Sequence, residues 1–276
     1  MVAVSDSATE NLTGVAGGAI EISGVSIGFG ALDVVKDIDL SVRPGEFICL
    51  LGPSGCGKST QLASIAGFVP LRGGQVTCCD EPVRGPNRQA GMVFQSTDAL
   101  FDWLTVEQNV AYGPRMSGMS KAEQKQVATA NLEMVGLRHA AQKYPHELSG
   151  GMKQRVQIAR VLANHRPVIL MDEPFGALDA QTRQVLQEEL GKIWRRTGCT
   201  VVFVTHDIDE AITLADRVVV MSAGPRARIK SVYDVDLPRP RARTHPGVSE
   251  LYELLREDIR AEVLASMQAQ GIEEEL

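Results

Sequence analysis

The sequence lacks several features that would each point to a class of protein. It has no apolar run long enough to cross a bilayer, and no basic start followed by an apolar stretch as in signal peptides. Lys and Arg (28) do not outnumber Asp and Glu (34), and the formal net charge is −6. We therefore expect no membrane-spanning segment, no signal peptide, and no nucleic-acid partner held by bulk charge.

Cysteine is scarce and shows no metal-binding pattern. The number of cysteines is odd, and none are spaced like zinc ligands. They are Cys49, Cys56, Cys78, Cys79 and Cys199. We expect reduced thiols, as is usual in the cytosol. A hydrophobic content of 44% over 276 residues is enough for one large domain, or for a domain with a subdomain.

A glycine-rich stretch that fits the phosphate-loop pattern G-x-x-x-x-G-K-[ST] is the strongest signal present. Its residues are Gly52, Pro53, Ser54, Gly55, Cys56, Gly57, Lys58, Ser59 and Thr60. The apolar run 47–51 before it predicts a buried strand, and the segment 59–66 after it predicts a helix. A strand, a glycine-rich turn and a helix form the context that confirms the motif, so we predict nucleotide binding.

The chemistry of such a loop follows from its shape. Glycines let the backbone curl so that its N–H groups face phosphate oxygens, and the helix start adds the positive end of its dipole. We expect Lys58 to reach the β- and γ-phosphates and the Ser59 hydroxyl to bind Mg²⁺.

Apolar strand-like runs alternate with helical segments, which predicts an α/β fold with a parallel sheet. Residues 1–18 are small and polar, and we expect a flexible tail. Strand signals are missing between about 97 and 166, which indicates an inserted helical subdomain. The proline- and arginine-containing segment 237–243 is interpreted as a linker, and an amphipathic helix is predicted over about 249–268.

Polar residues follow three predicted strands and would complete the site. Ligands of phosphate-loop proteins bind at the carboxyl ends of parallel strands, where Gln95, Asp172 and His206 can converge. Asp172 would hold Mg²⁺, and Glu173 beside it would polarise a water for in-line attack. Gln95 would orient that water or contact Mg²⁺, and His206 would stabilise developing charge. Gln95 and His206 are weak signals alone, but their order on this scaffold favours function.

Ser149, Gly150 and Gly151 have the character of a second anion-binding helix start. Ser149 is a good N-cap residue, and the small residues after it permit close backbone approach. The chain already has one phosphate loop, so a second anion site makes sense if it faces a nucleotide held by another copy of the chain. The alternative is an ordinary helix cap.

Two aromatic positions leave alternatives open. Phe29 lies between two glycines, and it either stacks on an adenine ring or is a core or turn residue. The apolar loop 100–104 is either core of the helical subdomain or a docking surface for a partner.

Together these motifs resemble the ATP-binding subunit of ABC transporters, over about residues 19–235. The matching segments in chain order are Walker A at 52–60, the Q-loop at Gln95, the signature motif at 148–152, Walker B at 168–173, the D-loop at 177–179 and the switch histidine at His206. The resemblance implies a RecA-like core with an antiparallel β subdomain and an inserted helical subdomain, an ATPase domain over 19–236, and the ligands ATP and Mg²⁺.

The resemblance also assigns roles to single residues. Asp179 and Met152 join the nucleotide-binding residues, although glutamine is commoner than methionine at the end of the signature. Phe29 takes the place of the adenine-stacking aromatic. The implied mechanism closes two chains head to tail around two ATPs, with hydrolysis through Glu173 and His206.

A narrower resemblance is to importer subunits for taurine, aliphatic sulfonates, nitrate and bicarbonate. It rests on the segments 65–68, 85–87, 101–106 and 237–240, although Asp102 replaces a proline that is usual in that branch. The family implies a dimer of ATPase subunits, two transmembrane permease subunits and an extracytoplasmic substrate-binding protein, with this chain peripheral on the cytoplasmic face of the inner membrane.

The cargo is the least defined expectation. Taurine or another aliphatic sulfonate is our first expectation, and nitrate or bicarbonate is the alternative. Two further hypotheses are a soluble ABC ATPase without a membrane partner and a phosphate-loop kinase or GTPase.

Overall fold

The computed structural model of the chain describes residues 16–96, 99–176, 178–241 and 245–269. Most of the expected tail, 1–18, falls outside these ranges. Gly18 already belongs to the folded part, because its N–H donates to the Pro167 carbonyl (3.4 Å) and its own carbonyl accepts from the Thr200 hydroxyl (2.7 Å).

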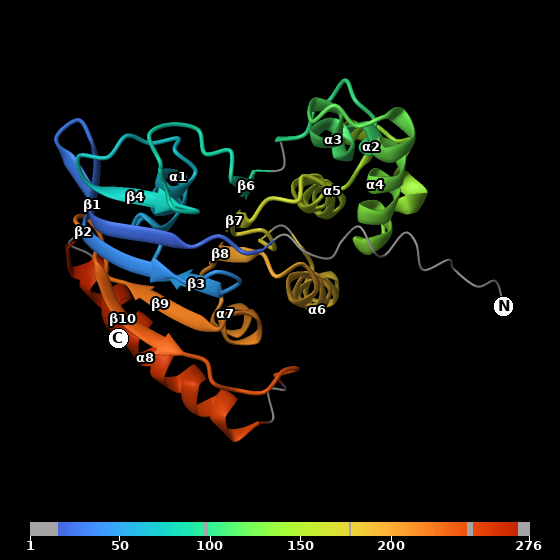
Figure 1. Cartoon of the computed structure of the whole chain (residues 1–276). Coiled ribbons are helices and arrows are strands. Elements are labelled where there is room, and N and C mark those ends of the chain that lie inside the picture. Colours follow the sequence, from blue (N-terminus) through green and yellow to red (C-terminus); the bar gives the residue numbers. More distant parts are fainter. Residues whose placement is uncertain (1–15, 97–98, 177, 242–244, 270–276) are drawn as a thin grey trace.

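A six-stranded sheet forms the centre of the molecule (Figure 1). Five strands are parallel, in the spatial order β9, β3, β8, β7, β6, and β10 pairs antiparallel with β9 at one edge. Their bounds are β3 Phe47–Leu51, β6 Ala90–Val93, β7 Val168–Asp172, β8 Thr200–Val204, β9 Arg217–Met221 and β10 Ile229–Asp234. Every residue of the three central strands β3, β8 and β7 is buried, which explains their unbroken apolar sequences.

A four-stranded antiparallel sheet and helix α1 (Lys58–Ile65) cover one face of the central sheet. Its strands are β1 Ile20–Phe29, β2 Leu32–Val42, β4 Gly73–Cys78 and β5 Glu81–Pro82, in the order β2, β1, β4, β5. Alternate side chains of β3 divide between the two faces. Ile48 and Leu50 join the core under α1 and this sheet, whereas Phe47, Cys49 and Leu51 join the opposite core. The expected α/β core with an antiparallel β subdomain is confirmed.

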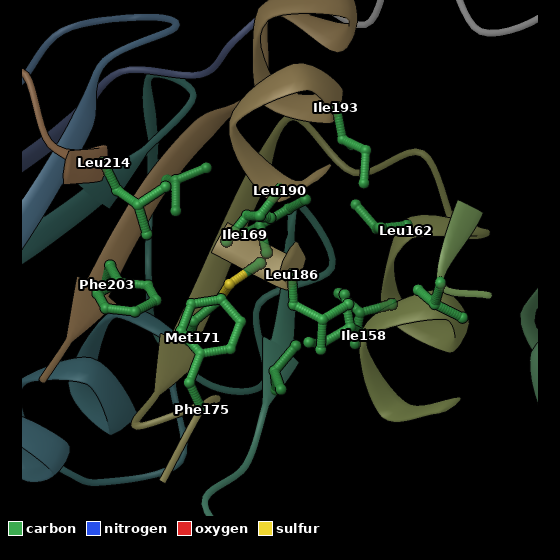
Figure 2. Packing of buried hydrophobic residues seen from close by; sticks show 14 of the residues in the cluster. Ile158, Leu162, Ile169, Met171, Phe175, Leu186, Leu190, Ile193, Phe203 and Leu214 are labelled. Atoms are coloured by element: carbon green, nitrogen blue, oxygen red, sulfur yellow. The ribbon is translucent and has the colours of Figure 1, made fainter. Parts of the chain in front are cut away.

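Helices cover the opposite face of the central sheet. They are α5 Gly150–Leu162, α6 Ala180–Thr197, α7 Ile208–Leu214 and α8 Pro246–Ala269. Figure 2 shows how Leu186 and Leu190 of α6 lie against Met171 of β7, with Ile158 of α5 beside them. Apolar residues three or four positions apart on α6 therefore form the stripe that faces the sheet.

The described part of the expected helical subdomain is helical and contains no strand. Its elements are α2 Val106–Val110, α3 Tyr112–Met116, α4 Lys121–Met134, the 3-10 turns η4 Arg138–Ala140 and η5 Pro145–Glu147, and α5. In Figure 1 they gather beyond the β6 edge of the sheet. The capping box expected before α4 is present, because Ser120 accepts from the Glu123 N–H (3.4 Å) and Glu123 accepts from the Ser120 N–H (2.7 Å).

The segment after β10 is anchored, which differs from the interpretation of 237–243 as a linker. The Arg239 guanidinium lies over the Trp194 ring, 4.8 Å from its centroid. Arg241 donates to the carbonyls of Ile212 (2.7 Å) and Ala215 (2.5 Å), at the end of α7. Burial, together with the neighbouring Arg239 charge, lowers the pKa of Arg241 to about 10. Arginine in this segment thus supplies the donors that the last carbonyls of α7 need.

Helix α8 begins three residues before the expected start and packs on the domain. Val248, Leu251 and Leu255 are its buried residues. In Figure 1 it runs along β9 and β10. Within the described ranges, no helix combines the length and apolar character needed to cross a membrane. The five cysteines are unpaired thiols.

The contact between α6 and the sheet gives a stability prediction. Leu190 is 3% exposed, whereas Val185 on the same helix is 58% exposed. Leu190→Ala leaves a cavity and should cost about 2–4 kcal/mol, which lowers the melting temperature by roughly 5–10 °C. Val185→Ala is the matched control and should shift it by about 1–2 °C or less. Equal shifts in thermal unfolding for the two variants would contradict this packing.

Candidate nucleotide site

The phosphate loop between β3 and α1 is held in shape by its neighbours. Gly57 is the N-cap of α1 with φ 95°, and a Cβ there would lie 2.6 Å from Val35 Cγ1 of β2. A Cβ on Gly52, whose φ is 156°, would lie 2.9 Å from the Met221 carbonyl at the end of β9. Both positions therefore require glycine, for backbone angle and for space.

Lys58 lies inside the curl of this loop. Its Nζ donates to the carbonyls of Gly52 and Pro53, each at 2.8 Å, and lies 3.8 Å from Cys56 Sγ. The side chain is almost entirely buried. Burial raises the pKa of the Cys56 thiol, so the sulfur beside this ammonium stays protonated at neutral pH. The loop thus keeps one positive charge where phosphate oxygens bind in phosphate-loop proteins.

Ser59 and Asp172 join the helix start to the end of β7. The Ser59 hydroxyl donates to Asp172 Oδ1 at 2.9 Å, although the residues are 113 positions apart. Only β8 lies between β3 and β7 in the sheet, which brings the two ends close. Burial raises the pKa of Asp172, while the Ser59 hydrogen bond and the Lys58 charge oppose that shift. Burial is the larger effect, so the Asp172 carboxyl holds its proton more tightly than an exposed Asp does.

Glu173 is the point where the predicted polar strand ends meet. Its Oε2 accepts from Gln95 Nε2 at 3.1 Å and lies 3.2 Å from His206 Nδ1. Its backbone has φ 43°, a left-handed value that is uncommon outside glycine. Its N–H donates to the Val204 carbonyl (3.0 Å), which fixes the turn. The structure thus brings Gln95, Glu173 and His206 into one cluster, next to the Ser59–Asp172 pair.

Two buried glutamines of α5 support Gln95 and were missed from the sequence. Gln154 Nε2 donates to the Phe94 carbonyl (3.3 Å), and Gln157 Nε2 donates to the Ser96 carbonyl (2.6 Å). Both side chains are 1% exposed. Two amides three positions apart on the core face of a helix are a signal for such a role, because buried amides need partners.

His206 also has a local support that sequence reasoning missed. Asp207, the N-cap of α7, accepts from the N–H groups of Asp209 (2.8 Å) and Glu210 (3.2 Å). Arg183 of α6 lies 3.4 Å from the same carboxylate. An Asp directly after the histidine is a typical helix N-cap, and that was the available signal.

Two further groups of predicted residues form the N-caps of helices α5 and α6. Ser149 caps α5 by accepting from the Met152 N–H (3.4 Å), and a Cβ on Gly150 would meet nothing within 4 Å. Asp179 caps α6 and accepts from the Thr182 N–H at 3.0 Å. Figure 1 shows α5 among the helices beyond β6, while α1 lies beside β4, so the two helices whose starts are expected to bind anions are separated in one chain.

Phe29 lies at the end of β1, in the turn to β2. It is 54% exposed, so it is not a core residue. Arg72 donates to the Gly30 carbonyl next to it and pairs with Asp33 (2.5 Å). Phe29 pairs with Leu32 of β2, and the side chain of Val35, three residues further along β2, lies next to Gly57 of the phosphate loop.

The donor set fits Mg²⁺ with a phosphate ligand. Hard divalent cations prefer oxygen, and here a hydroxyl and a buried carboxylate lie 2.9 Å apart at the start of α1. Lys58 and the glycine curl supply charge and space for phosphate oxygens. A parallel sheet with this loop, a carboxylate pair and polar strand ends defines the class of phosphate-loop nucleoside triphosphatases.

Comparison with known proteins identifies the family within that class. The ABC transporter family matches residues 35–176. An uncharacterised ABC transporter ATP-binding protein of Methanocaldococcus jannaschii is 47% identical over 84% of this chain and 86% of its own length. A solved structure, a dimeric ATP-binding cassette in a post-hydrolysis state with ADP and phosphate, superposes with a TM-score of 0.71 at 31% identity, over 79% of this chain and all of that one. The chain therefore belongs to the ABC transporter family, as an ATP-binding and ATP-hydrolysing subunit.

Relatives named for import match the narrower branch. The nitrate import ATP-binding protein NrtD of Synechococcus elongatus is 46% identical over 80% of this chain and 81% of its own length. The bicarbonate transport ATP-binding protein CmpC of a Synechocystis strain is 46% identical over 82% of this chain but 34% of its own length. These matches confirm the resemblance to the importer branch. They are inconsistent with a kinase or GTPase reading.

The raised pKa of Asp172 gives a pH-dependent prediction. Because burial raises the folded-state pKa above the unfolded value, the chain loses stability as pH rises through the folded pKa. Asp172→Asn removes that loss, so the variant should melt at a higher temperature than wild type at pH 7.5 when no nucleotide is added. The gain should shrink as pH falls toward about 4, near the unfolded pKa of Asp.

Asp179→Asn is the control, because the pKa of Asp179 is shifted in the opposite direction. Both variants are compared by scanning fluorimetry. Hydrogen bonds from Thr182 lower the pKa of Asp179, so its charge is favourable in the folded chain. It should show no gain at pH 7.5. An equal gain in both variants would refute the assigned cause.

Proposed function

We propose that this subunit hydrolyses ATP to power the import of a small anion, with nitrate or bicarbonate ahead of taurine. Family membership supports the energy source, and the names of NrtD and CmpC support the anion class. Taurine and other aliphatic sulfonates, the first expectation from the sequence, appear in neither name and rank second.

The observation that carries the proposed chemistry is the convergence on Glu173 Oε2. An oxygen that lies 3.1 Å from Gln95 Nε2 and 3.2 Å from His206 Nδ1 is oriented by two side chains from two other strand ends. Glu173 would take a proton from a water that attacks the γ-phosphate. Gln95 would position that water, and His206 would donate to the γ-phosphate as charge develops.

Lys58, Ser59 and Asp172 would hold the phosphates and the metal. Lys58 is already held within the loop, so it needs only to exchange carbonyl partners for β- and γ-phosphate oxygens. Mg²⁺ held by Ser59 and Asp172, with Gln95 as a further ligand, would neutralise phosphate charge. The backbone of Gly52 to Thr60 would bind the remaining oxygens.

A second copy of the chain would complete each ATP site. Ser149, exposed at the start of α5, and the stretch to Met152 are separated from the phosphate loop of the same chain. The dimeric cassette reported above supports pairing of two copies. In such a pair, this helix start would face the other copy's nucleotide. Asp179 would lie near the dimer seam, and Phe29 would stack on the adenine.

The helical subdomain presents a surface for a membrane partner. Trp103 is 74% exposed, while Leu100 in the same loop is 6% exposed. The loop 100–104 is therefore partly core and partly surface, and Trp103 stacks obliquely near Phe101 at 5.3 Å. We place two permease subunits against this side, a substrate-binding protein on the other side of the membrane, and no nucleic acid among the partners. This puts the subunit peripherally at the cytoplasmic face of the inner membrane.

Glu173→Gln separates ATP binding from hydrolysis. The amide cannot accept a proton, so turnover should fall by about 100-fold or more, while ATP still binds and holds the dimer closed. Phosphate release and sedimentation with ATP measure the two effects. Glu188→Gln on the exposed face of α6 is the control and should behave as wild type. Undiminished hydrolysis in the Glu173 variant would remove this residue from its role.

Reconstitution tests the cargo. The chain should be assembled in vesicles with its permease and binding protein, and ATP turnover should be measured with nitrate, bicarbonate, taurine and an amino acid. We expect a several-fold stimulation by nitrate or bicarbonate. Stimulation by taurine alone would reverse the ranking of anions. Stimulation by the amino acid alone would exclude small-anion import.

A further inference from the structure

The hairpin Ser222–Arg228 between β9 and β10 lies directly against the phosphate loop. A Cβ placed on Gly224 would be 3.2 Å from the Gly55 carbonyl and 3.7 Å from Cys56 Cα. The backbone of the hairpin therefore touches the backbone of the loop, with no side chain between them. Gly55 has φ 78°, so the loop is in a left-handed turn at this contact. A displacement of the hairpin would therefore displace Gly55 of the phosphate loop.

The second half of the hairpin is also hydrogen-bonded to β2. The N–H of Arg226 donates to the Asp33 carbonyl and that of Ala227 to the Val34 carbonyl, each at 3.0 Å. Ala227 is completely buried. Val34 and its neighbour Val35 also line Gly57, so the hairpin and β2 together enclose one side of the phosphate loop.

A carboxylate of the C-terminal helix α8 binds the first half of the hairpin, at Ala223. Glu262 Oε2 of α8 accepts from the Ala223 N–H at 2.7 Å, one residue before Gly224. Its Oε1 pairs with Lys230 Nζ at 2.9 Å, and its side chain is 15% exposed. A short hydrogen bond to a half-buried, paired carboxylate is among the stronger contacts in proteins.

The attachment of α8 to the domain does not depend on Glu262. Asp258, one turn earlier, accepts from the Tyr233 hydroxyl at 2.8 Å and pairs with Lys230 at 3.2 Å. Leu251 and Leu255 are buried against the core. Removing Glu262 should therefore free the hairpin corner while leaving the helix in place.

From these contacts we propose that Glu262 is a positioning residue for nucleotide binding, acting through the Ala223–Gly224 corner of the hairpin on the phosphate loop. A loop that is ordered before ATP arrives loses less conformational freedom on binding. The C-terminal helix thereby sets the affinity for nucleotide. This inference rests on residues 52–60 being the nucleotide site, and it extends the proposed function to a segment more than 200 residues away in sequence.

Three variants test the proposal in the full chain. Glu262→Ala should raise the Kd for MgADP, measured by calorimetry, and the KM for ATP by about three- to tenfold, or about 0.7–1.4 kcal/mol. The kcat at saturating ATP should stay within about twofold, because the cluster around Glu173 is untouched. Glu262→Gln keeps an acceptor for Ala223 and should restore most of the affinity. Glu253→Ala, an exposed carboxylate of α8 paired only with Arg256 at 3.2 Å among the described contacts, should match wild type.

The outcomes separate positioning from stability. A lower melting temperature with unchanged Kd in Glu262→Ala would overturn the proposal, as would no rescue by glutamine. If Glu262→Ala does not fold, Gly224→Ala provides the test, because its added methyl group would press on the Gly55 carbonyl. An unchanged Kd for MgADP in Gly224→Ala would overturn the proposal. Lys58→Ala checks the site itself. If that variant keeps wild-type affinity, the assignment of the phosphate loop fails, whereas loss in Lys58→Ala alone refutes only the role of Glu262.

Discussion

The rest of the site depends on the parallel alignment of the central strands, and the hydrogen bond from Ser59 to Asp172 results from it. Parallel strands β3, β8, β7 and β6 are neighbours, so all their carboxyl ends open on one edge of the sheet. The phosphate loop follows β3, and the acidic pair follows β7. Because every residue of the three central strands is buried, the register of these ends is fixed by the core of the domain. The chemistry at the edge is therefore as rigid as the packing beneath it.

Much of the fold could be predicted because its signals are local. The strand over 47–51, the phosphate loop and the Ser120 capping box each lie within a few residues, and the structure has all three. The convergence of Gln95, Asp172, Glu173 and His206 could also be predicted, because parallel strands impose it. Local sequence and one topological rule were sufficient for the strand-end residues.

Other features could not be predicted because their partners are backbone groups far away in the sequence. Arg241 was assigned to a linker, yet its guanidinium satisfies carbonyls at the end of α7, 26 and 29 positions earlier. Gln154 and Gln157 bind carbonyls about 60 positions away. A carbonyl is present at every residue, so sequence alone does not say which one will need a donor.

The two glutamines of α5 have a mechanical consequence. They hold the segment Phe94–Ser96 with partly buried hydrogen bonds, whereas the Gln95–Glu173 bond is exposed to solvent. If the helices beyond β6 turn as a unit against the sheet, this segment travels with α5 and the exposed bond opens first. Such a rotation would separate Gln95, the residue proposed to position the attacking water, from Glu173, the proposed base, before the core is disturbed. A rotation of a few degrees would then slow ATP hydrolysis.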